Sequence, residues 1–224
     1  MFHMHPALRF SVFACFAAAL VWGCTSCETD SSAPGATWPS ATPEERGLDS
    51  GELAAVVERI DGQNLPIDSM LVVRDGVLVL DAYFYPYLGE QPHDVASVTK
   101  SVTSTLVGIA VDRELLSLDQ NVLSSFPDVD PGSPLGAKAD IELHHLLSMS
   151  SGLDCGRSPG EPELYQMLAS NNYVEYALQL PMALAPGREF AYCSPGSHLL
   201  SAMVSDAAGQ SSFEFASKQL FNPL

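Results

Sequence analysis

Two apolar, β-branched runs joined by an Asp-Gly pair place the strongest constraint on the fold of this chain. The runs cover residues 69–73 and 77–84, and Arg74, Asp75 and Gly76 connect them. An Asp-Gly pair favours a tight turn whose twist matches that of two antiparallel strands. The sequence therefore predicts a β-hairpin. A hairpin alone is marginally stable, and the chain does not obviously supply further strands to pair with it.

Apolar residues at helical spacing dominate the chain outside the hairpin. One helix is expected to start near Asp49 and to carry an apolar stripe that ends with Ile60. The helices expected after residue 94 are Ser97–Val111, Asp119–Phe126, Ile141–Met149, Pro162–Leu180, Ser197–Ala208 and Phe213–Leu220. The inward stripe of the first of these would be Val98, Val102, Leu106, Ile109 and Ala110. Together, these patterns predict an α+β fold with a helical region and an N-terminal hairpin.

The charge of the chain excludes one large class of functions. Its 224 residues carry 27 acidic and 10 basic side chains, for a formal net charge of −17. Nucleic-acid binding needs a cationic surface that displaces counterions from phosphates, and this composition provides none. The apolar content of 46% is high enough for a sizeable core, so the chain is expected to fold.

The N-terminal residues resemble an export signal. Arg9 precedes an apolar run from Phe10 to Trp22, and about thirteen residues are too few to span a bilayer but suit a secretory signal. Gly23 and Cys24 follow the run, as in the lipobox of bacterial lipoproteins, although Trp22 departs from that pattern. Cys24 is therefore the expected lipidation site, and an ordinary cleaved signal is the alternative. Either reading places the mature protein outside the cytoplasm, in the bacterial periplasm or cell envelope.

The sequence divides into a signal peptide over residues 1–23, a flexible tether over 24–43 and a folded domain over 44–224. Residues 25–43 are rich in Ser, Thr, Pro and Gly and show no periodicity, which is typical of a tether. Cys24 and Cys27 form a C-x-x-C pair, but no second ligand pair accompanies it. We therefore expect no metal site, and any membrane contact would come through a lipid anchor.

Ser97 and Lys100 form a candidate nucleophile and base. The chain has three lysines, and only Lys100 has a serine three positions before it. On a helix this spacing puts both side chains on one face. A serine hydroxyl becomes a good nucleophile when a neighbouring base takes its proton, and a partly desolvated lysine can be that base. The S-x-x-K pattern alone is weak, because a Ser/Lys pair on an exposed helix face is common.

Two later segments give the pattern its context. Residues 146–153 read LLSMSSGL, and residues 186–194 read PGREFAYCS before another predicted helix. The ordered set S-x-x-K, LL-x-M-x-SGL and PG-x-x-F-x-Y-x-S resembles the serine β-lactamase and penicillin-binding-protein superfamily. It is most similar to the class C β-lactamase-like branch, which includes esterases, D-aminopeptidases and 6-aminohexanoate-dimer hydrolases. The resemblance covers residues 47–224 and implies a β-lactamase/transpeptidase-like fold.

The resemblance also assigns roles to four residues. It implies that Ser97 is acylated, that Lys100 manages its proton, and that Tyr192 protonates the leaving group and activates the deacylating water. Ser194 would contact the substrate where class C β-lactamases have an asparagine. That difference argues against efficient β-lactam hydrolysis and favours small esters, amides or peptides. No cofactor is implied, and the oligomeric state is left open.

Several of these residues have plainer interpretations. Tyr192 could be an ordinary buried tyrosine, and Ser194 could cap a helix. The adjacent His144 and His145 are expected to point to different sides of a helix and to have structural roles. Cys155 and Cys193 lie in segments that should meet at the site, which makes a disulfide between them a hypothesis in an oxidising compartment.

The third motif of the superfamily, Lys/His-x-Gly on a C-terminal strand, does not occur after Tyr192. In relatives that strand joins the hairpin and supplies an oxyanion-hole N–H. The simplest expectation is a C-terminally truncated chain whose fold is incomplete. Two hypotheses follow: an exported Ser–Lys–Tyr hydrolase, or a catalytically inactive fragment or penicillin-sensor-like binding module.

Overall fold

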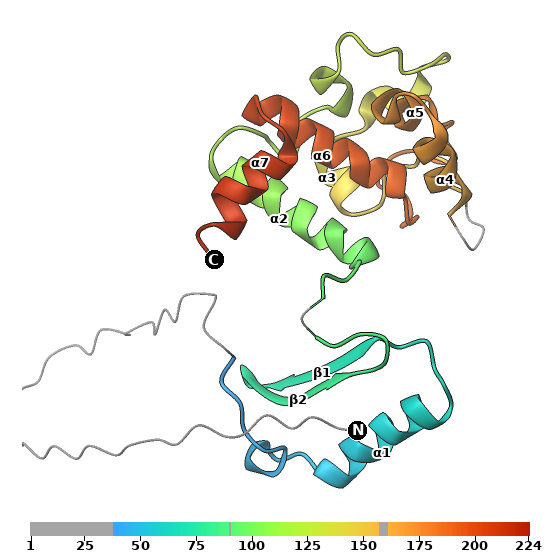
Figure 1. Cartoon of the computed structure of the whole chain (residues 1–224). Coiled ribbons are helices and arrows are strands. Elements are labelled where there is room, and N and C mark those ends of the chain that lie inside the picture. The colour runs from blue at the N-terminus through green and yellow to red at the C-terminus, as the bar shows by residue number, and fades with distance from the viewer. Residues whose placement is uncertain (1–37, 90, 157–160) are drawn as a thin grey trace, which may run out of the picture. The chain divides into compact units, whose positions relative to one another are not determined.

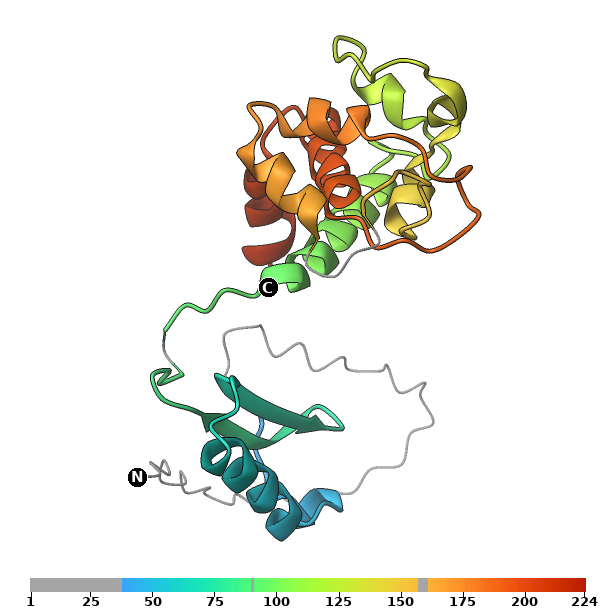
Figure 2. The same cartoon turned by 90° about the vertical axis from the view of Figure 1, so that its right-hand side faces the viewer.

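The computed structural model describes residues 38–89, 91–156 and 161–224. Its elements comprise a helix with a hairpin, followed by a series of helices (Figures 1 and 2). Within the described residues, no helix has the length and apolar character needed to cross a membrane. Residues 1–23 and Cys24, where the sequence predicts a signal and a lipidation site, lie outside the described residues.

The predicted hairpin is confirmed. Strand β1 (Ser69–Arg74) pairs antiparallel with β2 (Val77–Tyr83). The two residues of the turn, Asp75 and Gly76, have φ values of 51° and 75°, as a twist-matched two-residue turn requires. The Asp-Gly pair therefore fixes the register of this small sheet.

Helix α1 (Ser50–Gly62) runs along one face of the hairpin in both cartoon views. The Asp49 side chain caps it by accepting hydrogen bonds from the backbone N–H groups of Gly51 and Glu52. Its buried residues are Val57 and Ile60, which belong to the apolar stripe expected from the sequence.

The predicted tether is too long at its C-terminal end. Ser40 forms a parallel bridge with Leu78 of β2. The N–H of Leu78 donates to the carbonyl of Pro39 at 2.8 Å, and the N–H of Ala41 donates to the carbonyl of Leu78 at 3.2 Å. Residues 39–41 are therefore held against the hairpin, because its edge strand offers unpaired backbone groups.

Helix α6 is the centre of the helical region. It contacts the other main helices around it, and Leu199, Met203 and Val204 on its length are almost completely buried. The helices of this region are α2 (Thr99–Asp112), α3 (Leu143–Leu147), α4 (Pro162–Ala169), α5 (Tyr173–Gln179), α6 (Ser194–Ala208) and α7 (Ser212–Ala216). Gly209 ends α6 in a left-handed conformation, as predicted.

The structure corrects three helix predictions. The single helix expected over 162–180 is two helices, because Asn172 caps α5 by accepting from the N–H of Glu175. The helix expected over 119–126 is only a short 3-10 turn over Val122–Ser125. Val98, expected to face inward, is 61% exposed because it belongs to a 3-10 turn before α2.

Lys138 is a buried cation in the helical region and is 4% exposed. Its ammonium group donates to the backbone carbonyls of Pro131 and Leu178. Burial lowers the pKa of this lysine, because the charged form loses hydration. The lysine thus joins an irregular loop to the end of α5 and satisfies carbonyls that lack helical partners.

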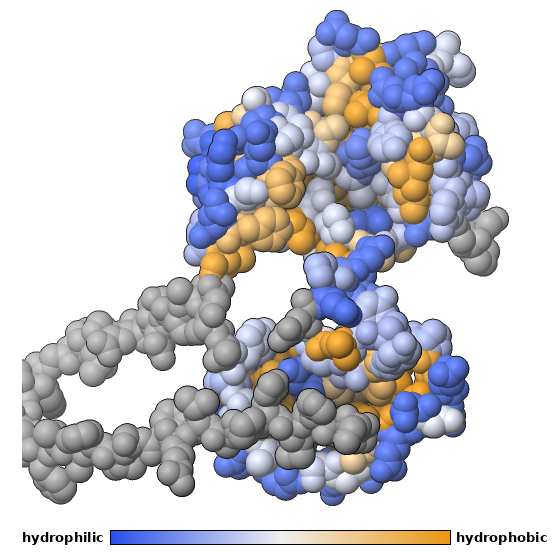
Figure 3. Space-filling model, in the orientation of Figure 1, coloured by the Kyte–Doolittle hydropathy of each residue, from blue (hydrophilic) through white to orange (hydrophobic). Residues whose placement is uncertain are grey.

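On the face of the helical region shown in Figure 3, apolar residues gather in limited areas among polar ones. One such area covers the C-terminal segment after α6. Phe213, Phe221 and Leu224 of this segment are at least half exposed. The core beneath them is formed by residues of α2, α3, α5, α6 and α7.

Candidate active site

Ser97 lies on a strained turn at the start of α2. A 3-10 turn over Ala96–Val98 leads directly into the helix. Ala96 has φ of 43°, which is uncommon for a residue with a side chain. Its N–H donates to the carboxylate of Asp94 at 2.7 Å, which holds the turn in place. Ser97 is exposed on this turn, two residues before the start of α2.

The three predicted catalytic side chains meet at one oxygen atom. The Lys100 ammonium donates to Ser97 Oγ at 3.1 Å, and the Tyr192 hydroxyl donates to the same oxygen at 2.8 Å. Lys100 Nζ also lies 5.0 Å from the centre of the Tyr192 ring. Lys100 is half-buried and Tyr192 is 39% exposed, so the cluster is open to a ligand yet only partly hydrated.

The LLSMSSGL segment holds the stretch of chain that carries Tyr192. The carbonyl of Met149 accepts from the N–H of Ala191 at 2.7 Å, and the carbonyl of Ser150 accepts from Gly187 at 2.8 Å. The Ser148 and Ser150 hydroxyls are 2.7 Å apart. These serines therefore shape the loop, and the loop in turn positions Tyr192.

Gly152 permits the closest approach between these segments. Its carbonyl accepts from the N–H groups of Ala183 and Leu184. Its φ is +79°, and a Cβ at this position would lie 2.3 Å from the carbonyl oxygen of Leu184. Only glycine fits here, both sterically and conformationally.

A disulfide joins Cys155 to Cys193, as hypothesised from the sequence. Cys193 directly follows Tyr192 and is the N-cap of α6, where its sulfur accepts from the N–H of Gly196 at 3.2 Å. The crosslink therefore fixes the start of α6 beside Tyr192. The helix-capping role considered for Ser194 belongs to Cys193 instead.

Ser194 lies in the first turn of α6 and is 6% exposed. Its hydroxyl donates to a carboxylate oxygen of Glu161, the residue before α4. Sequence analysis did not identify Glu161, because its only local signal is the helix start marked by Pro162. The hydrogen bond from Ser194 thus brings an acidic group into the neighbourhood of the cluster.

The two adjacent histidines do not point apart, contrary to the prediction from sequence. Their ring centres are 3.9 Å apart, and possible ligand atoms of Glu142, His144 and His145 lie within 4.8 Å of one another. His145 Nδ1 is already used, because it accepts from the backbone N–H of Glu142 in a capping box. Burial and the neighbouring His144 lower the pKa of His145, which favours its neutral form.

The comparisons identify the family. A family model described as Beta-lactamase matches residues 53–224, which is more than half of the chain. The chain belongs to the Beta-lactamase family. The matched region contains Ser97, Lys100 and Tyr192. The cluster of this Beta-lactamase-family chain therefore lies within the part of the chain that the family model covers.

Curated and solved relatives agree with the assignment. Esterase EstB from Burkholderia gladioli is 29% identical over 127 residues, which is 52% of this chain and 32% of the esterase. A penicillin-binding protein homologue from Pyrococcus abyssi is 27% identical with a TM-score of 0.61, and the match covers 79% of this chain and 43% of that one.

A third comparison shows the same fold at lower identity. A β-lactamase/D-alanine carboxypeptidase from Yersinia pestis is 23% identical with a TM-score of 0.55, and the match covers 69% of this chain and 47% of that one. The α+β, β-lactamase/transpeptidase-like fold predicted from the sequence is therefore confirmed. The Beta-lactamase-family chain spans less than half the length of these three relatives.

Proposed function

We propose that the protein is an exported serine hydrolase that forms an acyl-enzyme on Ser97 and acts on small esters, amides or peptides. One observation carries this proposal: Lys100 and Tyr192 both donate hydrogen bonds to Ser97 Oγ. A hydroxyl in contact with two groups that can exchange protons is the arrangement that nucleophilic catalysis needs. The esterase relative supports the choice of ester substrates for this family member.

In the proposed reaction, Ser97 Oγ attacks the carbonyl carbon while its proton passes to Lys100 or Tyr192. The accepting group must first have released its own proton. The negative charge on the carbonyl oxygen is stabilised by backbone N–H groups and the dipole at the start of α2. Tyr192 then protonates the leaving oxygen or nitrogen, and later activates the water that releases the acyl group.

The first test is covalent labelling by a fluorophosphonate probe, in which Ser97 Oγ bonds to phosphorus and fluoride leaves. The full chain is expected to gain the mass of one phosphonyl group, whereas Ser97→Ala gains none. Ser101→Ala is the matched control, since Ser101 is exposed on the same helix and lies outside the cluster. Intact-mass spectrometry reads out the result.

Two outcomes would contradict the proposal that the protein is a hydrolase acylated at Ser97. Absence of labelling in folded protein would favour the alternative of an inactive fragment or a penicillin-sensor-like binding module. Equal labelling of the Ser97→Ala variant would move the reactive group elsewhere. Circular dichroism of each variant shows whether the helices are retained.

The proposed location is the bacterial cell envelope, with Cys24 as the lipid attachment site. In cells fed an alkyne-labelled fatty acid, the full chain should incorporate label and sediment with membranes. Cys24→Ala should lose the label, because the lipid is attached through this thiol, and should leave the membrane fraction. Label that persists in Cys24→Ala would contradict the proposed lipid attachment at Cys24. Cys27→Ala serves as the matched control.

A further inference from the structure

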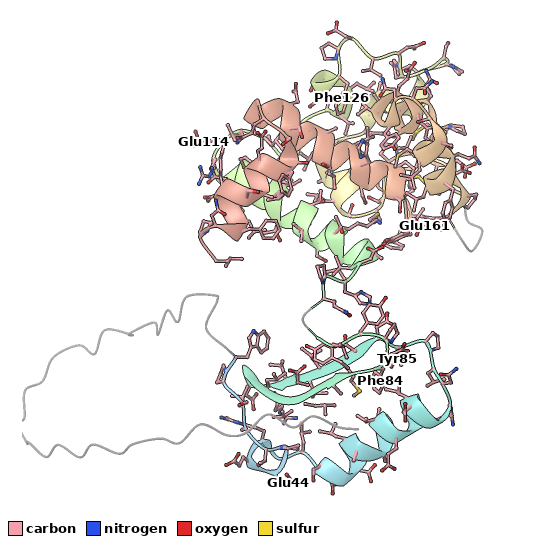
Figure 4. All side chains as sticks on the ribbon, viewed as in Figure 1. Glu44, Phe84, Tyr85, Glu114, Phe126 and Glu161 are labelled. Atoms are coloured by element: carbon pink, nitrogen blue, oxygen red, sulfur yellow. A yellow bond between two sulfur atoms is a disulfide. The ribbon has the colours of Figure 1, made fainter. Side chains whose placement is uncertain are left out.

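Glu161 places a carboxylate against Ser194, which lies two residues after Tyr192 of the proposed active site. Its carboxylate accepts a hydrogen bond from the buried Ser194 hydroxyl. Ser194 follows Tyr192 by two residues, so their Cα atoms are at most about 7 Å apart. Figure 4 labels Glu161 in the helical region, near the start of α4. The Tyr192 hydroxyl donates to Ser97 Oγ, so Glu161 is connected to the proposed nucleophile through Ser194 and Tyr192, two residues of the same short segment.

The backbone of Glu161 is held in an unusual conformation. Its φ and ψ are 46° and 61°, in the left-handed region that residues with side chains seldom adopt. It is the N-cap of α4, yet its carboxylate makes no capping bond to that helix. The carboxylate instead crosses to Ser194. A strained residue whose side chain turns away from its own helix and binds Ser194, two residues from Tyr192, is a candidate for a functional role.

The charge of this carboxylate has no protein counterpart among the residues that the structure describes. The ion pairs there join Arg74 to Asp75, His93 to Asp68, and His144 to Glu142. Ser194 supplies a dipole but no positive charge. A bound cation would complete the pairing, and the net charge of −17 would attract cationic ligands over anionic ones.

We propose that Glu161 is a specificity-determining residue that binds a positively charged group, such as a free amine, on the substrate. This inference rests on the proposed hydrolase function and narrows its substrates to cationic esters, amides or short peptides. Ser194 is then a positioning residue: its hydrogen bond aims the carboxylate at the substrate. The substrate's own ammonium group would donate to the carboxylate oxygens, which makes a charge-assisted hydrogen bond.

The test compares two fluorophosphonate probes of equal length, one with a terminal ammonium group and one with an uncharged methyl in its place. The wild-type chain is expected to react with the cationic probe about tenfold faster than with the neutral one. Glu161→Gln should bring that ratio close to one, because the amide keeps the size of the side chain but loses its charge. Second-order labelling rates of Ser97 are measured by mass spectrometry.

Glu163→Gln is the matched control. Glu163 lies two residues further along, and its carboxylate accepts from the Tyr176 hydroxyl at 3.1 Å, away from Ser194. This variant should keep the wild-type ratio. A ratio near one in the wild type, or an unchanged ratio in Glu161→Gln, would overturn the inference while leaving the hydrolase proposal intact. Failure of both probes to label folded wild type would overturn both proposals.

Discussion

Lys100→Met is expected to slow the acylation of Ser97 by about 10²–10⁴-fold, the usual contribution of a positioned acid or base. Methionine keeps the length of the side chain but removes the ammonium group that donates to Ser97 Oγ at 3.1 Å. The Tyr192 hydroxyl would remain hydrogen-bonded to Ser97 Oγ, but the lysine would no longer take part in the proton transfer. The rate of labelling by a neutral fluorophosphonate measures this loss directly.

Tyr192→Phe should cause a loss of similar size, and the double variant should lose little more than either single one. Residues that act as one proton-transfer unit have strongly non-additive effects. Lys218→Met is the control, since Lys218 is exposed and donates to Gln210. Full labelling rates in Lys100→Met would show that Lys100 is an ordinary surface partner of Ser97.

Loss of the Cys155–Cys193 disulfide is expected to destabilise the protein by about 3–4 kcal/mol. The bond closes a sequence separation of 38, so breaking it increases the freedom of the unfolded chain. Cys155→Ser is the better variant, because Cys193 also caps α6. Urea unfolding of the wild type and of Cys155→Ser measures the difference in free energy of unfolding.

The control for this prediction is the wild type under reducing conditions, which should unfold at the same urea concentration as Cys155→Ser. Peptide mapping after alkylation shows the state of each thiol. If Cys155 and Cys193 of the non-reduced protein are both alkylated, and Cys155→Ser is as stable as the wild type, the disulfide makes no contribution.

The sequence predicts those elements whose signals are local. The Asp75-Gly76 pair specifies a turn by its own backbone preferences, and Asp49 caps α1 through its own side chain. The prediction of a single helix over 162–180 is wrong, because the feature that divides it does not interrupt the apolar pattern. Its apolar spacing continues across the break, and the stop depends on the Asn172 side chain capping a new helix. A competing cap within a periodic pattern is easily missed.

The Ser97, Lys100 and Tyr192 cluster was expected from the motif order, and the structure brings these side chains together. Glu161 could not be found in that way. Its approach to Ser194 joins residues 33 positions apart and depends on a left-handed backbone that no spacing rule encodes. Contacts of this kind are set by how α4 packs on α6, which is a property of the folded core.

Gly152 changes how the LLSMSSGL motif should be interpreted. This glycine makes the segment recognisable, yet what it provides is room for the carbonyl of Leu184. The glycine of the motif therefore meets a requirement of backbone packing, and the proposed chemistry belongs to other residues. A related chain that had exchanged Ser97 for an inert residue would still need glycine at this position in order to fold. In the proposed hydrolase, the motif would therefore report the architecture, whereas reactivity would depend on Ser97, Lys100 and Tyr192.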